Sequence, residues 1–261
     1  MRTHDFVVVD AFTEKAFGGN PAAVMILDDF YPDDLLLKIA QEHNLSETAF
    51  LVKKGEAHYD LRWFTPGGEV PLCGHATMAS GYALFTEHGL EADEVRFETL
   101  SGTLKVSREK GRYALDLPAN MPTPVEHPPS LVDALGVDVE AVLEGQFWLV
   151  VLPTEDEVRM VRPNMAAIEA LPVPELGITA PGRDVDFVSR LFAPKLGIPE
   201  DPFTGSLHAM LVPYWSERLG KTSFKAHQAS SRGGDADCEL SSGRVVLRGN
   251  AATTMRGQLF F

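Results

Sequence analysis

The hydrophobic pattern of the chain contains two stretches that are apolar or small on almost every side, and each begins at a glycine. The first starts at Gly74 and has its first acid at Glu87. The second starts at Gly205 and has no Asp, Glu, Lys or Arg before Glu217. Helices without a polar face are buried on all sides. We therefore expect helices over residues 74–88 and 205–219, each enclosed by strands.

Shorter apolar runs bounded by turn residues predict the strands that enclose these helices. They cover residues 6–9, 22–27, 48–52, 58–64, 95–97, 103–106 and 113–117 in the first half, and 224–226, 238–240 and 245–247 in the second. Residues 32–44 differ, because a proline and two acids open a run whose apolar residues recur at helical spacing. We predict an amphipathic helix there and an α+β fold for the whole chain.

The two halves of the chain repeat one pattern. Gly74 and Gly205 lie 131 positions apart (205 − 74), and the upstream segment Arg62-Trp63-Phe64-Thr65-Pro66 is echoed by Arg190-Leu191-Phe192-Ala193-Pro194. We predict an N-terminal domain over residues 1–118, onto which C-terminal residues could pack back, and a C-terminal domain over residues 119–261. Prolines between residues 118 and 129 mark the linker. A duplicated fold of this kind predicts a small-molecule site in the cleft between its halves.

Composition narrows the possible functional classes. The 261 residues include 44% hydrophobic residues and carry a formal net charge of −14. Such an acidic chain lacks the basic surface that a phosphate backbone requires, so we expect no nucleic acid partner. Two cysteines are too few for a disulfide scaffold. We find no signal peptide and no run of roughly 18 apolar residues, and therefore expect a cytoplasmic protein without a membrane partner.

The glycines that open the two apolar helices are candidates for anion binding. A helix N-terminus presents unpaired N–H groups and the positive end of the helix dipole. Gly74 and Gly205 could therefore hold a substrate carboxylate without a basic residue, and Ser206 adds a hydroxyl. The alternative is that both are ordinary turn glycines. Because two such glycines occur at positions related by the repeat, binding of a substrate carboxylate is favoured over an ordinary turn.

Three further polar residues have both a structural and a functional interpretation. Glu47 is either a loop acid or a general acid–base, and its apolar neighbours Leu45 and Ala49 would reduce its solvation in a way that suits proton transfer. His75 is either a core histidine or a neutral ring that donates or accepts a hydrogen bond, because the helix dipole disfavours the imidazolium there. For Asp201 the residues alone indicate a turn acid ahead of the second helix, and its functional interpretation comes only from a family resemblance.

Several motifs, found in order along nearly the whole chain, resemble those of the PhzF-like phenazine-biosynthesis family. They are Val9-Asp10-Ala11-Phe12-Thr13, Gly19-Asn20-Pro21-Ala22, Asn44-Leu45-Ser46-Glu47-Thr48, Glu69-Val70-Pro71-Leu72-Cys73-Gly74-His75-Ala76-Thr77, Glu200-Asp201-Pro202-Phe203-Thr204-Gly205-Ser206 and Ser231-Arg232-Gly233-Gly234. The resemblance implies a diaminopimelate-epimerase-like fold, in which two pseudo-symmetric halves each wrap a mostly antiparallel sheet around a central helix, usually in a homodimer. It also implies cofactor-independent isomerisation of a small carboxylate-bearing molecule. The best-known reaction of the family isomerises trans-2,3-dihydro-3-hydroxyanthranilate.

The resemblance also implies roles for individual residues. Glu47 matches the proton-shuttling glutamate, His75 matches a catalytic position that helps to hold and protonate the substrate, and Asp201 matches a binding or catalytic carboxylate. The substrate carboxylate would be held by Gly74, Gly205 and Ser206. These six residues form the candidate site.

Two bulky residues depart from the family pattern. The family often has Val and Ala where this chain has Phe203 and Leu207, which leads us to expect a reshaped pocket. His208, in the same segment, is interpreted as structural. The histidines lack the close Cys/His spacing of zinc sites, and no G-x-G-x-x-G motif opens a helix, so we predict no metal and no cofactor.

Two other functions compete with the isomerase. Racemases and epimerases of this fold use one cysteine from each half, and Cys73 stands at the first of those positions. The repeat places Thr204 at the second, while Cys238 lies well downstream, so a two-thiol mechanism is disfavoured and Cys73 is interpreted as a packed thiol. The other competitor is a non-catalytic interaction protein built on the same fold.

Overall fold

The computed structural model describes residues 2–261. The chain divides into two compact units, one formed by Met1–Asp116 with Arg248–Phe261 and the other by Leu117–Leu247. The C-terminal segment belongs with the first unit because its strand β18 (Ala251–Phe260) pairs antiparallel with β1 (Thr3–Ala11). The second unit therefore ends near residue 247, before the end of the chain.

One curved sheet forms the framework of the first unit. β1 pairs with β18 on one side and with β2 on the other. Beyond β2 the sheet continues with β3, which runs parallel to β2. β4 then pairs antiparallel with β3, and β6 runs parallel to β4. β7 and β8 continue the sheet as an antiparallel meander, and β5 pairs with the end of β4. The strand bounds are β2 (Asn20–Leu27), β3 (Glu47–Gly55), β4 (His58–Thr65), β5 (Gly68–Val70), β6 (Glu94–Thr99), β7 (Gly102–Glu109) and β8 (Arg112–Pro118).

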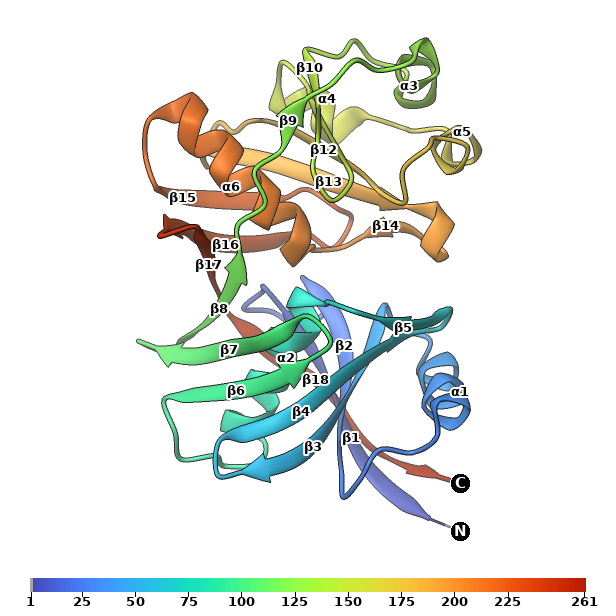
Figure 1. Ribbon diagram of the computed structural model, residues 1–261, viewed down its shortest axis with the longest axis vertical. Coiled ribbons are helices and arrows are strands. Elements are labelled where there is room, and N and C mark those ends of the chain that lie inside the picture. The colour runs from blue at the N-terminus through green and yellow to red at the C-terminus, as the bar shows by residue number, and fades with distance from the viewer. Residues whose placement is uncertain (1) are drawn as a thin grey trace. The chain divides into compact units, whose positions relative to one another are not determined.

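Two helices cover opposite faces of this sheet (Figure 1). Helix α2 (Gly74–Thr86) packs against β1, β2, β3 and β7, and all but two of its residues are buried, as its lack of a polar face predicts. Helix α1 (Asp33–His43) buries its apolar stripe against β3 and β4, where Phe50 and Val52 face it. Side chains alternate along a strand, so Glu47 and Ala49 project to the α2 side.

The second unit is built on the same plan. β11 runs parallel to β12, β13 pairs antiparallel with β12, and β15 runs parallel to β13, with β14 on the end of β13 and β16 beyond β15. On the other side β10 joins β11 to β9. The strand bounds are β9 (Thr123–Pro124), β10 (Ala141–Glu144), β11 (Trp148–Val151), β12 (Leu176–Pro181), β13 (Phe187–Ala193), β14 (Ile198–Asp201), β15 (Ser223–Gln228), β16 (Gly234–Ser241) and β17 (Arg244–Gly249).

Helices again occupy both faces of the sheet in the second unit. Helix α6 (Gly205–Leu219) takes the place of α2 and is buried over most of its length up to Trp215, while its last turn is exposed. Three short helices contribute to the core on the opposite face, with Leu176, Ile178 and Phe192 of the sheet packed among them. They are α3 (Pro129–Leu135), α4 (Glu155–Met160) and α5 (Met165–Glu169), and a 3-10 turn, η1 (Pro194–Leu196), follows β13.

A repeated ion pair fixes the correspondence between the two units residue by residue. In the first, Arg62 on β4 forms a bidentate pair with Glu69 at 2.7 and 2.7 Å and lies over the Phe64 ring. In the second, Arg190 on β13 pairs with Glu200 at 2.7 and 3.0 Å and lies over the Phe192 ring. The internal repeat predicted from the sequence is therefore a repeat of tertiary structure.

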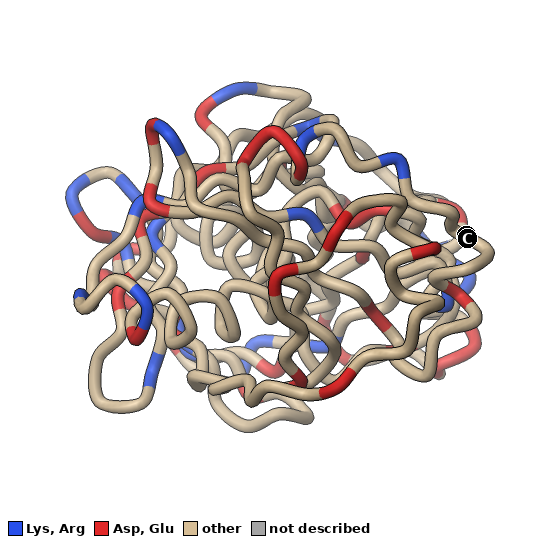
Figure 2. The backbone as a smooth tube through the Cα atoms, turned by 90° about the horizontal axis from the view of Figure 1, so that it is seen from above, with Lys and Arg blue, Asp and Glu red and all other residues tan. Residues whose placement is uncertain are grey.

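Charge and hydrophobicity place few constraints on partners. Acidic positions outnumber basic ones along the backbone, with 37 Asp and Glu against 23 Lys and Arg (Figure 2). No helix within residues 2–261 is long and apolar enough to cross a membrane. Any anionic substrate must be attracted by local groups, because the net charge opposes it.

Candidate active site

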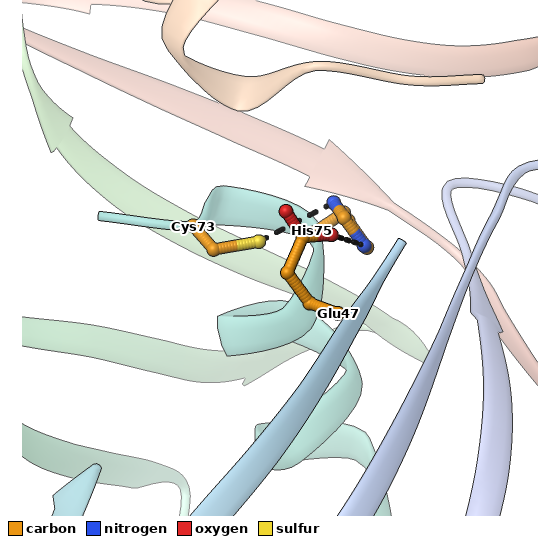
Figure 3. A group of neighbouring side chains, drawn as sticks. All are labelled: Glu47, Cys73 and His75. Carbon is orange, nitrogen blue, oxygen red and sulfur yellow. Dashed lines mark hydrogen bonds and ion pairs between the residues drawn. The ribbon is translucent and has the colours of Figure 1, made fainter. Parts of the chain in front are cut away.

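Glu47 and His75 meet in the first unit. Glu47 is the first residue of β3 and projects from the α2 side of the sheet, while His75 lies in the first turn of α2. The Glu47 Oε2 and His75 Nε2 atoms are 3.1 Å apart, and the two side chains are only 11% and 4% exposed (Figure 3). A carboxylate and an imidazole so placed can exchange a proton away from bulk water.

Asn20 contacts the other nitrogen of the same ring. Its Nδ2 atom lies 3.0 Å from His75 Nδ1, and the residue is completely buried at the start of β2. In the neutral ring the amide nitrogen donates to Nδ1, which leaves the proton on Nε2 facing Glu47. In the imidazolium Nδ1 becomes a donor, and a 180° rotation of the amide would present Oδ1 to accept from it. Asn20 therefore suits both protonation states of His75.

The Cys73 thiol completes this cluster. Cys73 is the N-cap residue of α2, and its sulfur lies 3.4 Å from His75 Nδ1 in a buried position. Burial, with a smaller effect of the Glu47 charge, raises the pKa of the thiol to about 11. At pH 7 the thiol is therefore neutral and a poor nucleophile.

The charge state of His75 follows from these neighbours. Burial lowers the pKa of its imidazole, whereas the contacts with Cys73 and Glu47 raise it, and the net shift of the pKa is upward. Because the Cys73 thiol is neutral at pH 7, Glu47 is the anion that acts on the ring. This upward direction runs against the neutral imidazole expected from the helix dipole, because a carboxylate 3.1 Å away favours the charged ring.

The same three side chains could in principle hold a metal ion. Glu47, Cys73 and His75 each offer one ligand atom, and these atoms lie within 4.8 Å of one another. However, the sulfur lies beside Nδ1 and the carboxylate beside Nε2, two different nitrogens of one ring. A single ion binds one of them, so at least one side chain would have to rotate. The arrangement fits a proton relay through the Glu47–His75 ion pair better than a metal site.

Asp201 lies in the second unit, in a closed turn that leads into α6. Its carboxylate accepts a hydrogen bond from the Thr204 hydroxyl. The Thr204 backbone N–H donates to Gln228 Oε1 at 2.9 Å, and Gln228 Nε2 donates to the Asp201 carbonyl at 2.8 Å. This buried network fixes the direction in which Gly205 and Ser206 begin the helix.

The two glycine-led helices start in the same way. α2 begins at Gly74 after Cys73, and α6 begins at Gly205 after Thr204, and in neither case does the N-cap side chain form a capping hydrogen bond. No N-cap side chain therefore competes for the first-turn N–H groups, and anion binding by these groups stays a prediction.

Comparison with known proteins decides the family. A family model described as phenazine biosynthesis-like protein matches residues 9–257. The chain belongs to this family. An uncharacterized isomerase of Pseudomonas aeruginosa is 46% identical, with 98% of each chain covered. The crystal structure of a PhzF family protein from Enterococcus faecalis superposes with a TM-score of 0.95 at 41% identity, covering 100% of both chains.

The epimerase-like fold of this PhzF family member is also confirmed. A hydroxyproline epimerase from Agrobacterium vitis is only 12% identical, yet matches 99% of this chain and 92% of its own with a TM-score of 0.66. At that identity the likeness shows the fold alone. The predicted family and α+β architecture are thus both correct.

The two residues that depart from the family pattern belong to the core of the second unit. Leu207 is fully buried, and a Cβ atom placed on Gly177 would lie 2.5 Å from its Cδ1 atom. Phe203 stacks on His208, with ring centroids 4.4 Å apart, and its Cδ2 atom lies 2.5 Å from the position of a Cβ on Gly234. Glycines on neighbouring strands therefore make room for both bulky side chains.

The candidate residues fall into two groups. Gly74, Glu47 and His75 lie together in the first unit, and Asp201, Gly205 and Ser206 lie together in the second. Sequence reasoning quoted Asn20 only as part of a motif and did not consider Gln228. Asn20 could have been found from its place in Gly19-Asn20-Pro21-Ala22, whereas nothing near Gln228 in the sequence indicates its contact with Thr204.

Proposed function

We propose that this PhzF family member is a cofactor-independent isomerase that moves a proton within a small carboxylate-bearing metabolite. Its membership of the isomerase class agrees with its relatives, three of which are named isomerases and are 41–46% identical to it. The observation that carries the mechanism is the buried contact of 3.1 Å between Glu47 and His75.

In the proposed reaction Glu47 acts first as base and then as acid. One carboxylate oxygen removes a proton from a carbon that an adjacent carboxyl or conjugated system has acidified, and the electron pair shifts along that system. Glu47 then returns the proton to another carbon of the same molecule, so no atoms or electrons are gained or lost. His75 donates a hydrogen bond to the carboxylate and holds it in place.

The remaining candidates are assigned to substrate binding. We propose that the amides at Gly74 and Gly205 and the Ser206 hydroxyl hold the substrate carboxylate, since helix N-termini favour negative charge. Asp201 would accept hydrogen bonds from polar substituents of the substrate. That both units contribute to one site stays a prediction.

The racemase alternative requires two thiolate bases. Cys73 is buried and its thiol is neutral at pH 7, while Thr204 occupies the corresponding position of the repeat and its hydroxyl donates to Asp201. Neither group is suited to remove a proton from carbon. A non-catalytic interaction protein, in turn, need not keep the buried carboxylate–imidazole pair.

The proposal is tested by incubating the protein with a panel of small unsaturated and amino-substituted carboxylates in deuterium oxide. Mass spectrometry and proton NMR would follow deuterium at carbon, with heat-denatured protein as the control. We expect at least one compound to gain a carbon-bound deuteron together with a shift of its double bond. Exchange in which the double bond stays in place and the stereocentre is scrambled would favour the racemase.

A further inference from the structure

We propose that Phe17 and Leu100 form an apolar rim beside the Glu47–His75 pair and cover the hydrocarbon part of the substrate while the proton moves. This inference rests on the proposed function and deepens it, because it assigns residues that contact the substrate away from its carboxylate. Among the large hydrophobic residues that the structure describes in the first unit, these two are the most exposed, at 79% and 72%. Exposed apolar side chains that gather in one place mark ligand sites.

Phe17 lies in the loop between β1 and β2, three residues before Asn20. The Asn20 side chain contacts the His75 ring. Three steps along the chain span at most about 11 Å between Cα atoms, so the backbone of Phe17 lies within that distance of Asn20. The exposed ring of Phe17 is therefore next to the segment that forms the site.

The backbone of Phe17 is held in an unusual conformation. Its φ angle is 70°, in the left-handed region that bulky residues rarely adopt. The Phe17 N–H donates to the carboxylate of Asp10 at 2.7 Å, and Asp10 is only 2% exposed. A buried acid thus holds a strained backbone whose aromatic side chain points into solvent. Strain of this kind is typical of functional positions, because it contributes nothing to packing in the unliganded protein.

Leu100 lies in the turn between β6 and β7, and the packing of β7 on α2 shows where this turn is. A Cβ atom on Gly81 would lie 2.5 Å from the Val106 side chain. One helical turn further along α2, the Arg108 guanidinium lies 5.3 Å from the centre of the Phe85 ring. β7 and α2 therefore run in the same direction, which places the turn before β7 beside the first turn of α2.

A hydrogen bond fixes the same turn to the segment that leads into α2. The Ser101 hydroxyl donates to the Pro71 carbonyl at 2.7 Å, and Pro71 precedes the N-cap residue Cys73 by two positions. The Cys73 sulfur in turn lies 3.4 Å from the His75 ring (Figure 3). The two side chains of the apolar rim thus come from different loops and border one site.

The apolar rim has a role because the proton-transfer pair is not completely closed. The side chains of Glu47 and His75 remain 11% and 4% exposed. Water that reaches the carboxylate would exchange the proton that Glu47 holds between its two steps, and a closed site expels such water. Phe17 and Leu100 offer water no hydrogen-bond partner, and they bind a hydrocarbon by removing it from water.

The binding test uses three carboxylates that differ only in chain length. Dissociation constants for acetate, butanoate and hexanoate would be measured by ligand-observed NMR with wild type, the double variant Phe17→Ala, Leu100→Ala and the control Phe260→Ala. Phe260 is 56% exposed and lies opposite Thr3, at the end of β1 away from the Phe17 loop. We expect hexanoate to bind wild type roughly 10-fold or more tightly than acetate. The double variant should lose most of this gain, and Phe260→Ala should keep it.

Solvent exchange separates this inference from the proposed function. With any compound that gains a carbon-bound deuteron in deuterium oxide, the double variant should take up more deuterium per turnover than wild type, because an uncovered Glu47 exchanges its proton with water. Glu47→Gln should instead stop turnover and keep the dependence of affinity on chain length. A loss of both effects can therefore be assigned to the residue that causes it.

Two results would overturn the inference. One is a wild type that gains no affinity from acetate to hexanoate, and the other is a double variant that keeps the gain. If the double variant also fell to the monomer mass while its affinities stayed unchanged, the apolar rim would be covered by a second copy of the chain and not by substrate. Thermal melting, with Phe17→Leu as a milder change that should keep most of the gain, would show that the variants are folded.

Discussion

His208 illustrates at the residue scale how burial sets the charge of a side chain. It is completely buried in α6, its Nδ1 atom donates to the Thr204 carbonyl at 2.8 Å, and its ring stacks on Phe203. Burial lowers its pKa from 6.5 to about 4. The interpretation of His208 as structural agrees with these contacts.

This shift predicts a pH dependence of stability. Between pH 6.5 and about 4 the unfolded chain binds a proton at His208 that the folded protein does not. The free energy of unfolding contributed by this residue is therefore intact above pH 6.5 and falls by about 1.4 kcal/mol per unit as the pH drops through that window. Urea unfolding at pH 7, 6, 5 and 4 would measure it, with His208→Asn as the non-titrating control. A constant difference between the two proteins across this range would contradict the prediction.

A site residue could be predicted from the sequence when its role depends on residues next to it in the chain. Glu47, His75 and Asp201 stand in short motifs, so the sequence indicates them directly. The contact of Asn20 with His75 joins residues 55 positions apart, and the pKa of His75 depends on a carboxylate from another strand. Such properties arise only when the sheet places β2, β3 and α2 together, and single-sequence patterns do not contain that information.

At the scale of elements, the close packing of strands on α6 depends on small residues. A Cβ atom on Gly234 would lie 2.5 Å from Phe203 Cδ2 and 3.1 Å from its Cβ and Cγ atoms. An aromatic ring stacked between His208 and a strand has little room to move. The Gly234 position in Ser231-Arg232-Gly233-Gly234 is thus explained by packing.

Gly234→Ala should therefore lower the free energy of unfolding, by about 1–3 kcal/mol, as is usual when a packed core is overfilled. Gly55→Ala is the matched control, because its added Cβ would have its nearest neighbour at 3.5 Å, an ordinary contact. Chemical denaturation would compare both with wild type. Combining Gly234→Ala with Phe203→Leu should restore part of the loss. If Gly234→Ala were as stable as the control, the packing argument would be wrong.

The long helices were predicted well, whereas the short helices were missed, and so were the buried strands β11, β12 and β13 of the second unit. The helices expected over residues 74–88 and 205–219 are α2 and α6, and the helix expected over 32–44 is α1. Helices α3, α4 and α5 have seven residues or fewer, too few turns for a helical period to be visible. Their local signals lie at their ends: the capping box of α4 from Thr154 to Glu157, the N-cap Asn164 of α5, and Pro129 and Gly136 at the two ends of α3.

Strand β18 was missed for a different reason. None of its residues is buried, so it shows no run of core positions. Its partner β1 lies at the far end of the chain, and its pairing is a long-range property that no local pattern indicates.

At the scale of the whole molecule, the resemblance to the family predicts a homodimer. Sedimentation velocity and light scattering at micromolar concentration should give about twice the chain mass of 28.5 kDa. Dilution over a hundredfold range serves as the control for weak self-association. A single species at the monomer mass throughout would contradict the dimer and leave the catalytic proposal unaffected.

The central claim is that Glu47, and not Cys73, moves the proton. The most direct measurement is the rate of turnover and of solvent-deuterium incorporation by wild type, Glu47→Gln and Cys73→Ser on one turned-over substrate, with folding checked by thermal melting. Glu47→Gln keeps the shape but removes the titratable carboxylate, so the rate should fall by roughly 10²–10⁴ or more, while Cys73→Ser should keep most activity. An inactive Cys73→Ser beside a nearly normal Glu47→Gln would show that the thiol carries the proton and that the account is wrong.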